Sequence, residues 1–266
     1  MRVLVTGVAG GIGRRIARRL LDGGHDVVGF DRDESRLDDV PDGVEASVVD
    51  LTDEHAVEAA VDGRQVDSLV SAVGWYQLGA IEDCDAATFR EHLESNLVAV
   101  HTVVHALLPT LRQREGRIVI VGSMVGHVAL PYHGAYSAAK AGLAGYADAL
   151  RREVEPRGVS VSQVEPGPAK TGFNERAAEG LGEQRDSPYA ADYAAFEGYS
   201  PAAAEPTEIA DTVVRAVEAD EPRSRYRIST RARLLPVLVG LLPDRIGDRI
   251  LRSGTPGGLL YRLIDR

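Results

Sequence analysis

Several residue types that particular protein classes require are scarce in this chain of 266 residues. Cys84 is the only cysteine, so no disulfide can form within the chain, and a cysteine–histidine metal cluster lacks its ligands. The longest near-continuous apolar run, 234–242, is interrupted by Pro236 and is much shorter than the roughly 20 residues of a membrane-spanning helix. No secretion signal precedes the first strand-like residues. We therefore expect a cytoplasmic protein that has no transmembrane segment and binds no metal.

Basic residues are also in the minority, with 30 arginines and lysines against 40 acidic residues and a net charge of −10. A nucleic-acid-binding protein usually shows a basic patch or stripe, and none is evident, so we do not expect nucleic acid as a partner. Lysine is especially rare, because Lys140 and Lys170 stand beside 28 arginines. The presence of a lysine at a particular position is therefore informative.

What the chain does contain is an alternation of short apolar segments with longer helical ones. Several of the short segments are apolar on both faces, which is typical of parallel strands covered by helices on either side. The pattern predicts an α/β fold, a Rossmann-like, doubly wound and mainly parallel sheet of about seven strands with helices on both faces. The strand candidates are 3–6, 26–30, 45–49, 68–72, 117–122, 160–164 and 226–229. The helix candidates are 12–22, 54–62, 86–113, 135–155 and 208–219.

No repeat, low-complexity tract or linker divides the chain, so we expect residues 1–266 to form a single domain. The stretch 172–206 is long for a connection inside a compact domain, and loops of that length are often functional. Its aromatic residues favour a partly ordered lid over the substrate, and they are Phe173, Tyr189, Tyr193, Phe196 and Tyr199. Residues 230–266 form a C-terminal apolar extension.

A glycine-rich turn, 6–13 with the sequence TGVAGGIG, follows the first strand candidate and opens the first helix candidate. Such a turn offers backbone N–H groups and the positive end of a helix to a pyrophosphate, and glycines let the ligand come close. The spacing of Thr-Gly, three residues and Gly-Ile-Gly resembles the signature of the short-chain dehydrogenase/reductase family. By this resemblance the turn binds the cofactor, through Gly7, Ala9, Gly10, Gly11, Ile12 and Gly13.

Asp31 ends the second strand candidate, 18 residues beyond Gly13. A carboxylate at this place accepts hydrogen bonds from the ribose hydroxyls of NAD and repels the 2′-phosphate of NADP. Gly10 also stands where NADP-using relatives often carry a basic residue. Arg14 and Arg32 lie nearby and soften this preference, and Arg32 is itself a candidate cofactor contact. We expect NAD as the cofactor, with NADP as the alternative.

The resemblance implies further cofactor contacts after the later strands. Asp50 and Leu51 resemble the family's adenine-contacting pair. Residues 71–74 read SAVG where relatives have NNAG. The asparagine side chains that brace the strand in relatives are therefore missing. Ala72 and Gly74 still allow the cofactor to come close to the backbone. Residues 166–171, PGPAKT, resemble the family's segment that meets the nicotinamide. Its cofactor contacts are Pro166, Gly167, Ala169 and Thr171, with Thr171 near the carboxamide.

Lys140 follows Tyr136 by four positions in an alanine-rich helical run, which places the two residues on one helix face. A free phenol titrates near pKa ~10, and a neighbouring ammonium would lower that pKa and bring proton exchange into range. Because lysine is so rare in this chain, a lysine at position 140 indicates that the position requires a compact ammonium group. A planar guanidinium group does not replace it. The pair resembles the family's general acid/base and its lysine, both of which also contact the cofactor.

The resemblance adds Ser123 and Asn96 to the reacting centre. Ser123 follows the fifth strand candidate and precedes Tyr136 by 13 residues, the family's place for a serine that bonds the substrate oxygen and stabilises charge there. Asn96 stands in the long helix candidate where relatives have an asparagine that kinks the helix and holds a water in a proton relay from the lysine. Together these residues predict an oxidoreductase acting on CH–OH groups by hydride transfer between NAD(H) and an alcohol or carbonyl.

The substrate is expected to be a small alcohol or ketone, bound where loops follow the strand ends. The candidate pocket residues are Trp75, Tyr76, His127, Leu130, Tyr132, His133 and Phe173. Two other functions stay open. One is a nonenzymatic cofactor-sensing or scaffold protein on the same fold. The other is an epimerase or dehydratase of the extended branch, which we rank last because its chains are longer and its glycine turn is shorter.

Two expectations concern contacts with other molecules. Relatives pair their fourth and fifth helices, so we expect a homodimer or homotetramer, helped by small residues such as Gly142, Ala144 and Gly145. In the tail, apolar residues of 230–252 are flanked by arginines, and two prolines divide them into short pieces. We expect this tail to cap the pocket or to contact a partner subunit, in preference to a peripheral membrane contact.

Overall fold

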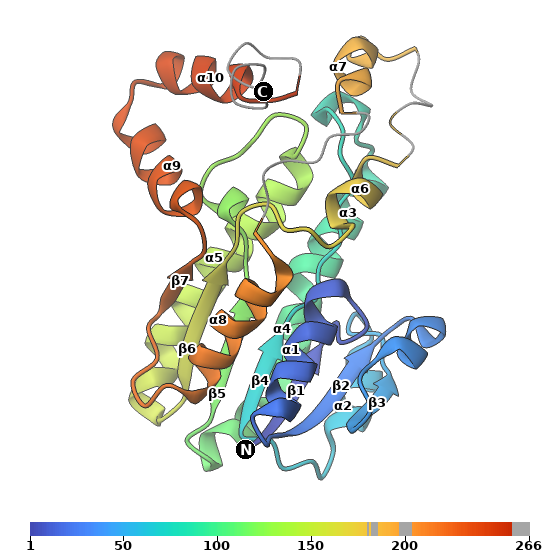
Figure 1. The fold of residues 1–266 in the computed structure, drawn as a ribbon, viewed down its shortest axis with the longest axis vertical. Helices are drawn as coiled ribbons and strands as arrows, with labels where there is room; N and C mark the ends of the chain where they lie inside the picture. Colours follow the sequence, from blue (N-terminus) through green and yellow to red (C-terminus); the bar gives the residue numbers. More distant parts are fainter. Residues whose placement is uncertain (180, 182–185, 197–203, 257–266) are drawn as a thin grey trace.

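The computed structural model describes residues 1–179, 181, 186–196 and 204–256. In these residues a sheet of seven strands has the order β3-β2-β1-β4-β5-β6-β7, and every neighbouring pair is parallel (Figure 1). The strands are β1 (Arg2–Thr6), β2 (Asp26–Asp31), β3 (Val44–Val48), β4 (Ser68–Ser71), β5 (Arg117–Val121), β6 (Ser160–Glu165) and β7 (Arg225–Arg227). The predicted doubly wound parallel sheet is confirmed.

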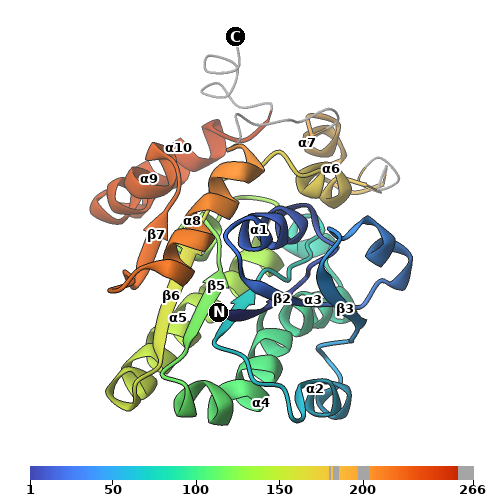
Figure 2. The same cartoon turned by 60° about the horizontal axis from the view of Figure 1, so that its bottom comes forward.

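Helices cover both faces of the sheet, because side chains alternate along each strand. The strands β1, β2, β4, β5 and β6 each contribute residues to two cores. On one face Leu4 packs with Val57, Val103 and Leu143. These come from α2 (Glu54–Val61), α4 (Ala99–Gln113) and α5 (Gly134–Val154). On the other face Val3 and Val5 pack against α1 (Gly11–Asp22) and α8 (Pro206–Glu218). Figure 2 shows these two helices side by side on that face of the sheet.

The apolar spacing of each helix explains the face that it buries. In α1 the fully buried side chains Ile16, Ala17 and Leu20 lie one turn apart on one face. Burying one such isoleucine or leucine stabilises the fold by about 1.5–3 kcal/mol. The helix expected over 86–113 is interrupted, because α3 (Ala86–Leu93) passes into a π-helical turn, η3 (Glu94–Val98), before α4 begins.

The strand order reverses at the centre of the sheet, where β1 has β2 on one side and β4 on the other. In a doubly wound sheet the loops on either side of such a point diverge, so a crevice opens at the carboxyl ends of the strands. The loops after β1, β2, β4, β5 and β6 all lead to this edge, which lies at the top of the sheet in Figure 1.

Shorter helical pieces complete the connections. The 3₁₀ turns are η1 (Glu34–Asp39), η2 (Ile81–Asp83), η4 (Met124–Gly126) and η5 (Glu155–Arg157). Within 172–206 the structure forms α6 (Phe173–Ala177) and α7 (Ala190–Ala194), and Tyr193 and Phe196 bury their rings against Tyr76 and Leu78. Tyr199 lies outside the described residues.

The tail forms α9 (Thr230–Leu241) and α10 (Asp244–Ser253). The expectation that two prolines would cut it into short pieces is only half right: Pro243 separates the two helices, but α9 continues through Pro236. Residues 257–266 of the extension are outside the described part of the chain. Among the helices that are described, none is long and apolar enough to cross a membrane.

Candidate active site

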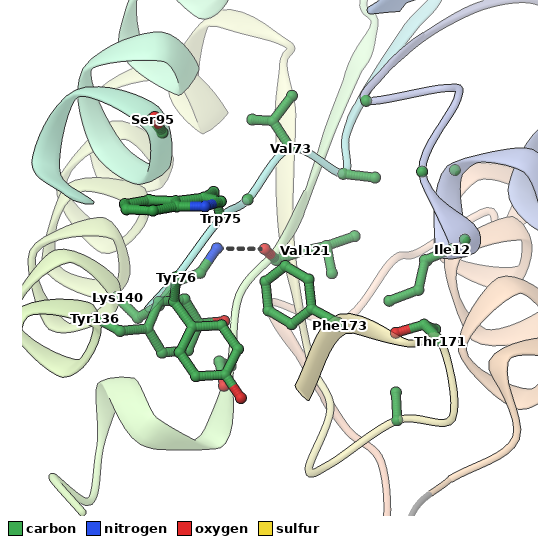
Figure 3. Close-up of a pocket in the computed structure, with 18 of the residues that line it drawn as sticks. Ile12, Val73, Trp75, Tyr76, Ser95, Val121, Tyr136, Lys140, Thr171 and Phe173 are labelled. Carbon is green, nitrogen blue, oxygen red and sulfur yellow. Dashed lines mark hydrogen bonds between the residues drawn. The ribbon is translucent and has the colours of Figure 1, made fainter. Parts of the chain in front are cut away.

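A cavity lies at the carboxyl edge of the sheet, above the point where the strand order reverses (Figure 3). On the β1–β4 side it is lined by ten of the expected cofactor residues, Gly7, Gly10, Gly11, Ile12, Gly13, Asp31, Arg32, Asp50, Leu51 and Ala72. On the β4–β6 side it is lined by Gly74, Ser123, Tyr136, Lys140, Pro166, Gly167, Ala169 and Thr171. The structure thus brings residues from the ends of six strands, together with Tyr136 and Lys140 of α5, into one site.

The glycine turn has no room for side chains. Gly7 has a φ of +71°, and a Cβ there would lie 2.9 Å from the carbonyl oxygen of Ala72. A Cβ on Gly13 would lie 2.0 Å from the carbonyl oxygen of Gly7. Helix α1 begins in this turn without an acidic residue in its first turn, so its N-terminal N–H groups and positive end favour an anion. The turn therefore fits the pyrophosphate of a dinucleotide.

Asp31 is held in place by the chain while part of its carboxylate stays available. Its Oδ2 accepts a hydrogen bond from the backbone N–H of Ala9 at 3.0 Å, and its Oδ1 accepts one from Asp33 at 3.2 Å. A carboxylate offers about four acceptor positions, so ribose hydroxyls can still bind. Ala9 itself does not line the cavity, and it acts through Asp31.

The arginines near Asp31 are mostly engaged elsewhere. Arg14 pairs with Asp39 at 2.7 Å, and Arg36 donates to the backbone carbonyl of Ala9 at 2.9 Å. Arg32 is exposed and lines the cavity. The pKa of the nearby Asp50 carboxyl is lowered, mainly by a hydrogen bond from the Thr52 backbone and to a smaller extent by the positive charge of Arg32. Arg32 and Arg36 both line the cavity, and Arg32 is the more exposed of the two.

Tyr136 and Lys140 share a face of α5 and are buried, with 8% and 4% of their surface exposed. The Lys140 Nζ lies 5.7 Å from the centre of the Tyr136 ring and donates to the Val121 carbonyl at 3.5 Å. On its other side the Tyr136 ring stacks on Tyr76, with ring centres 4.6 Å apart. Packing on both sides fixes the phenol in the cavity wall.

Burial controls the protonation of both groups. It raises the pKa of Tyr136, and a hydrogen bond with Ser123 opposes that rise only in part. Burial also lowers the pKa of Lys140 to about 8. The sequence predicted a lowered Tyr136 pKa, whereas burial of the phenol in the structure raises it. The phenol is thus held as a proton donor, the form that a developing alkoxide needs.

Asn96 lies behind the cavity wall, within the π-helical turn η3, and is fully buried. Its Nδ2 donates to the carbonyls of Trp75 and His92 at 2.6 and 2.9 Å, and its Oδ1 accepts from the Trp75 N–H at 3.3 Å. A Cβ on Gly74 would lie 3.2 Å from the Asn96 Oδ1 and 3.5 Å from the Lys140 Nζ. Asn96, Lys140 and the loop after β4 therefore meet at Gly74.

Aromatic rings form the wall expected for the substrate. The Tyr76 ring lies 4.9 Å from Phe173 and 5.7 Å from His133, and its hydroxyl donates to the Asn174 side chain at 2.7 Å. All four line the cavity, and so do Trp75 and Leu130. Tyr132 lies outside the lining, and its ring packs against Phe196 at 5.4 Å.

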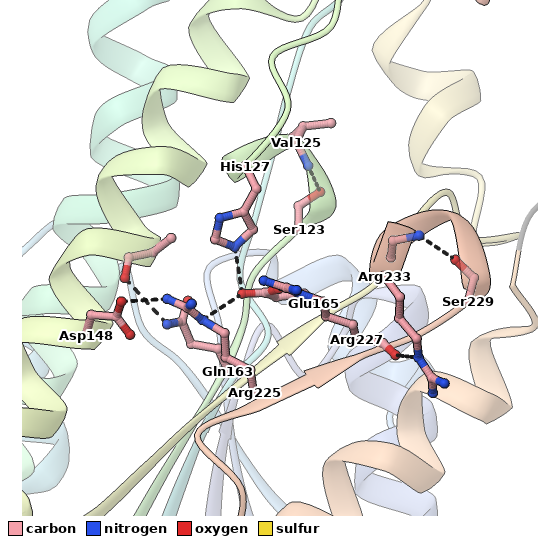
Figure 4. A network of polar contacts seen from close by, with 12 residues as sticks. Ser123, Val125, His127, Asp148, Gln163, Glu165, Arg225, Arg227, Ser229 and Arg233 are labelled. Carbon is pink, nitrogen blue, oxygen red and sulfur yellow. Dashed lines mark hydrogen bonds and ion pairs between the residues drawn. The ribbon is translucent and has the colours of Figure 1, made fainter. Parts of the chain in front are cut away.

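His127, which the sequence placed in the substrate pocket, does not line the cavity. Its Nε2 lies 2.8 Å from the Glu165 Oε1 (Figure 4). Glu165 is 1% exposed, and it also meets the Nε atoms of Arg225 at 3.3 Å and Arg227 at 3.0 Å. The loop after β5 turns this histidine toward the buried carboxylate at the end of β6, away from the ligand space.

Burial alone would raise the pKa of the Glu165 carboxyl, but hydrogen bonds from His127 and Arg227 outweigh it, so that pKa is lowered. The network joins the loop after β5, the end of β6 and β7, directly before Pro166 and Gly167. Sequence reasoning did not single it out, although a glutamate ending an apolar strand is a signal that could have been used.

Three further lining residues, Asn174, Arg176 and Arg231, were also missed. They come from α6 and α9, segments for which no motif was recognised. Both arginines are exposed at the cavity. Within the described parts of the chain, no group of three or more histidine, cysteine or acidic side chains is placed to hold a metal ion.

The sequence model of the family described as short chain dehydrogenase matches residues 1–182, well over half of the chain. The chain belongs to the short-chain dehydrogenase family. The resemblance carried by its motifs is therefore confirmed at the level of the family. Members are oxidoreductases that use nicotinamide cofactors, and the cavity described above fits such a cofactor.

Individual relatives cover nearly the whole chain. It is 30% identical over 264 residues to an uncharacterized oxidoreductase, YbbO, of Escherichia coli strain K12, covering 94% of each. It is 28% identical to an NADPH-dependent 3-dehydrocapnine reductase of Ornithobacterium rhinotracheale, covering 93% of this chain and 94% of the relative. A crystal structure of a short-chain dehydrogenase from Streptomyces avermitilis superposes with a TM-score of 0.73 and 30% identity, covering 87% and 88% of the two chains.

Proposed function

We propose that this short-chain dehydrogenase transfers a hydride between NAD(H) and the carbonyl or carbinol carbon of a small ketone or alcohol. The observation that carries the proposal is the placement of Ser123, Tyr136 and Lys140 in one cavity with the glycine turn. The bound nicotinamide supplies or accepts the hydride. The chain's own residues then handle the oxygen of the substrate and its proton.

In the reducing direction, Tyr136 gives its hydroxyl proton to the substrate oxygen as negative charge develops there. Ser123, which hydrogen-bonds Tyr136, also donates to that oxygen and stabilises the charge. Lys140, with its pKa lowered to about 8, can hold or release a proton near neutral pH, and Asn96 meets it at Gly74. We propose that the proton path from Lys140 passes between Asn96 and Gly74. For oxidation, the same residues act in the reverse direction.

We further propose NAD(H) as the cofactor in preference to NADP(H). Asp31 is held by Ala9 and keeps free acceptor positions for ribose hydroxyls, while its charge repels a 2′-phosphate. Arg14 pairs with Asp39, and Arg36, which also lines the cavity, donates one hydrogen bond to the Ala9 carbonyl. The alternative rests on Arg32, which lines the cavity, and on the NADPH dependence in the name of the Ornithobacterium relative.

A panel of ketones and secondary alcohols, followed at the nicotinamide absorbance with both cofactors, tests the proposal. The panel should include apolar substrates, because Trp75, Tyr76, Leu130 and Phe173 form the wall and α6 lies beside it. Turnover with NAD(H) supports the enzyme. Tight NADH binding without turnover of any carbonyl would favour the cofactor-sensing alternative.

We also propose a homodimer or homotetramer that uses α4 and α5. Gly142 and Gly145 lie exposed on α5, and a Cβ on Gly145 would meet nothing within 4 Å, so this part of the helix is open to a close partner. Sedimentation at the working salt concentration should give a mass of two or four chains. A monomer would refute this assembly.

A further inference from the structure

The tail helices turn large apolar side chains toward solvent. Ten large apolar residues are exposed in the described chain, and six of them lie in α9 and α10. The two helices together bury only Ala232 and Gly247. Both views place them at the carboxyl edge, outside the layers that cover the sheet (Figures 1 and 2). The exposed six are Leu234, Val237, Leu238, Leu241, Ile246 and Ile250.

Their spacing groups the exposed residues on one side of each helix. In α9 the exposed positions 234, 237, 238 and 241 follow the i, i+3, i+4, i+7 pattern of one helix face. In α10, Ile246 and Ile250 are one turn apart. Large apolar side chains of a helix in a water-soluble fold normally pack on the core, whereas here Leu241 is 78% exposed.

The charge of the same segment is opposite to that of the rest of the chain. Residues 230–253 hold five arginines and two aspartates, a net charge of +3, although the whole chain carries −10. Among the described residues none of these arginines has an ion-pair partner, and all five are exposed. They are Arg231, Arg233, Arg245, Arg249 and Arg252.

We propose that this tail surface, the six apolar residues with the five arginines, docks on the headgroup region of an anionic lipid bilayer. Interfacial helices insert an apolar face at the boundary of the acyl chains and hold cationic side chains among the phosphates. Arginine binds phosphate oxygens through paired N–H groups, which suits the exposed arginines of this segment. The structure therefore favours the membrane contact that the sequence ranked second.

The acidic body does not prevent this contact. At physiological ionic strength, charges more than a screening length of about 8 Å away are largely hidden from a surface, so the tail's own +3 dominates at contact. A second copy of the chain is the less suitable occupant. A two-fold contact through this surface would bring the same unpaired arginines face to face.

The same helix also reaches the active-site cavity. Arg231, in the first turn of α9, lines the cavity, and Leu234 lies three residues further along. A docked tail therefore holds the cavity mouth close to the bilayer surface. The sequence predicted that the tail would cap the pocket. Among the described tail residues, only Arg231 lines the cavity.

Sedimentation of the full chain with vesicles tests the proposal. Vesicles of phosphatidylcholine mixed with phosphatidylglycerol should carry the protein into the pellet at physiological salt. Replacing Leu238→Asp together with Leu241→Asp should lower the partition coefficient by about tenfold or more, because two large apolar contacts are lost. Neither residue lines the cavity, so binding of NADH should be unchanged.

Val48→Asp is the control for a negative charge placed outside the tail, because Val48 is 51% exposed on β3. It adds one of the two charges that the double variant adds, and it should bind vesicles as the unaltered chain does. Arg245→Gln with Arg249→Gln should weaken binding to the anionic vesicles by about fivefold per arginine and leave the weak binding to phosphatidylcholine alone unchanged. A chain ending at Pro256 should still bind, because the surface lies before that residue.

Three outcomes would overturn the proposal. The unaltered chain could stay in the supernatant with both kinds of vesicle. The Leu238 and Leu241 double variant could bind as well as the Val48 control. Vesicle binding could vanish when the chain ends at Pro256, which would move the contact to the last ten residues. If the double variant instead changes the sedimenting mass without vesicles, the tail surface is a subunit contact.

Discussion

The two sides of the cavity are built differently. On the β1–β2 side, the ligand would meet backbone N–H groups and polar side chains, among them Asp31, which only two backbone N–H groups hold. On the β5–β6 side it meets side chains that are buried: Tyr136, Lys140 and, one layer behind, Glu165 with its histidine and two arginines. The two acidic residues end strands at the same edge of the same sheet.

The difference separates binding from reaction. A backbone cradle can hold a pyrophosphate with little dependence on side chains, so changes on the β1–β2 side should alter cofactor affinity alone. Proton transfer needs buried side chains with shifted pKa values, and burying charged groups needs a supporting network. Changes on the β5–β6 side should therefore alter turnover or stability.

The largest effect is expected from Tyr136→Phe. The ring that stacks on Tyr76 is kept and the hydroxyl that exchanges the proton is lost. General acid/base catalysis typically contributes about 10²–10⁴-fold, so kcat should fall by that factor, while NADH affinity changes little. Steady-state rates and a fluorescence titration of NADH measure both. Near-normal turnover by this variant would remove Tyr136 from the mechanism.

A smaller effect, on stability, is expected from Glu165→Ala. Removing the carboxylate leaves one histidine and two arginines without their shared partner, which should cost about 2–3 kcal/mol of unfolding free energy. The cost is below that of a fully buried pair because the arginine side chains are 31% and 29% exposed and can be rehydrated. Urea unfolding measures it, with Asp31→Ala as the control that should lose less than about 1 kcal/mol.

The pH dependence of the same residue has a defined sign. Because the pKa of Glu165 is lowered in the folded chain, its contribution is complete above the ordinary glutamate value of about 4.3 and disappears as the pH falls through the folded value. The difference in stability between the unaltered chain and Glu165→Gln should therefore be full at neutral pH and shrink below about pH 4. A difference that stays constant down to that range would show that the carboxylate charge is not what stabilises the network.

The smallest effect is expected from Asp31→Ala, which should change the ratio of NAD to NADP affinity by about tenfold in favour of NADP. Loss of the carboxylate removes both the acceptor for ribose hydroxyls and the repulsion of a 2′-phosphate. Isothermal titration with each cofactor measures the ratio. Glu165→Gln should leave this affinity ratio unchanged. If both variants changed the ratio equally, the β1–β2 and β5–β6 sides of the cavity would not differ in the way described.

The sequence was most informative where the structure depends on local patterns. The strands, the turn around Gly7 and the helix face of Tyr136 follow from spacing along the chain, and all of them appear at the expected places. The direction of the Tyr136 pKa shift could not be predicted, because it depends on how deeply the phenol is buried and on its hydrogen bond with Ser123.

Contacts between distant segments were also beyond the sequence. His127 pairs with a carboxylate 38 residues later, so its spacing to Ser123 gave no hint that it leaves the cavity. Arg231 reaches the cavity from a tail that matches no motif. The exposure of Leu241 could not be foreseen either, since an amphipathic pattern does not say whether its apolar face meets the core.

The central claim is that this chain moves a hydride between NAD(H) and a carbonyl carbon. The most direct test uses NADH that carries deuterium at the transferable position of the nicotinamide ring, with a ketone found active in the panel. The account predicts that the alcohol formed by the unaltered chain carries one deuterium on its carbinol carbon, and that Tyr136→Phe forms almost none of this product. An alcohol without deuterium, or NADH that is bound and never oxidised by any ketone, would contradict the account.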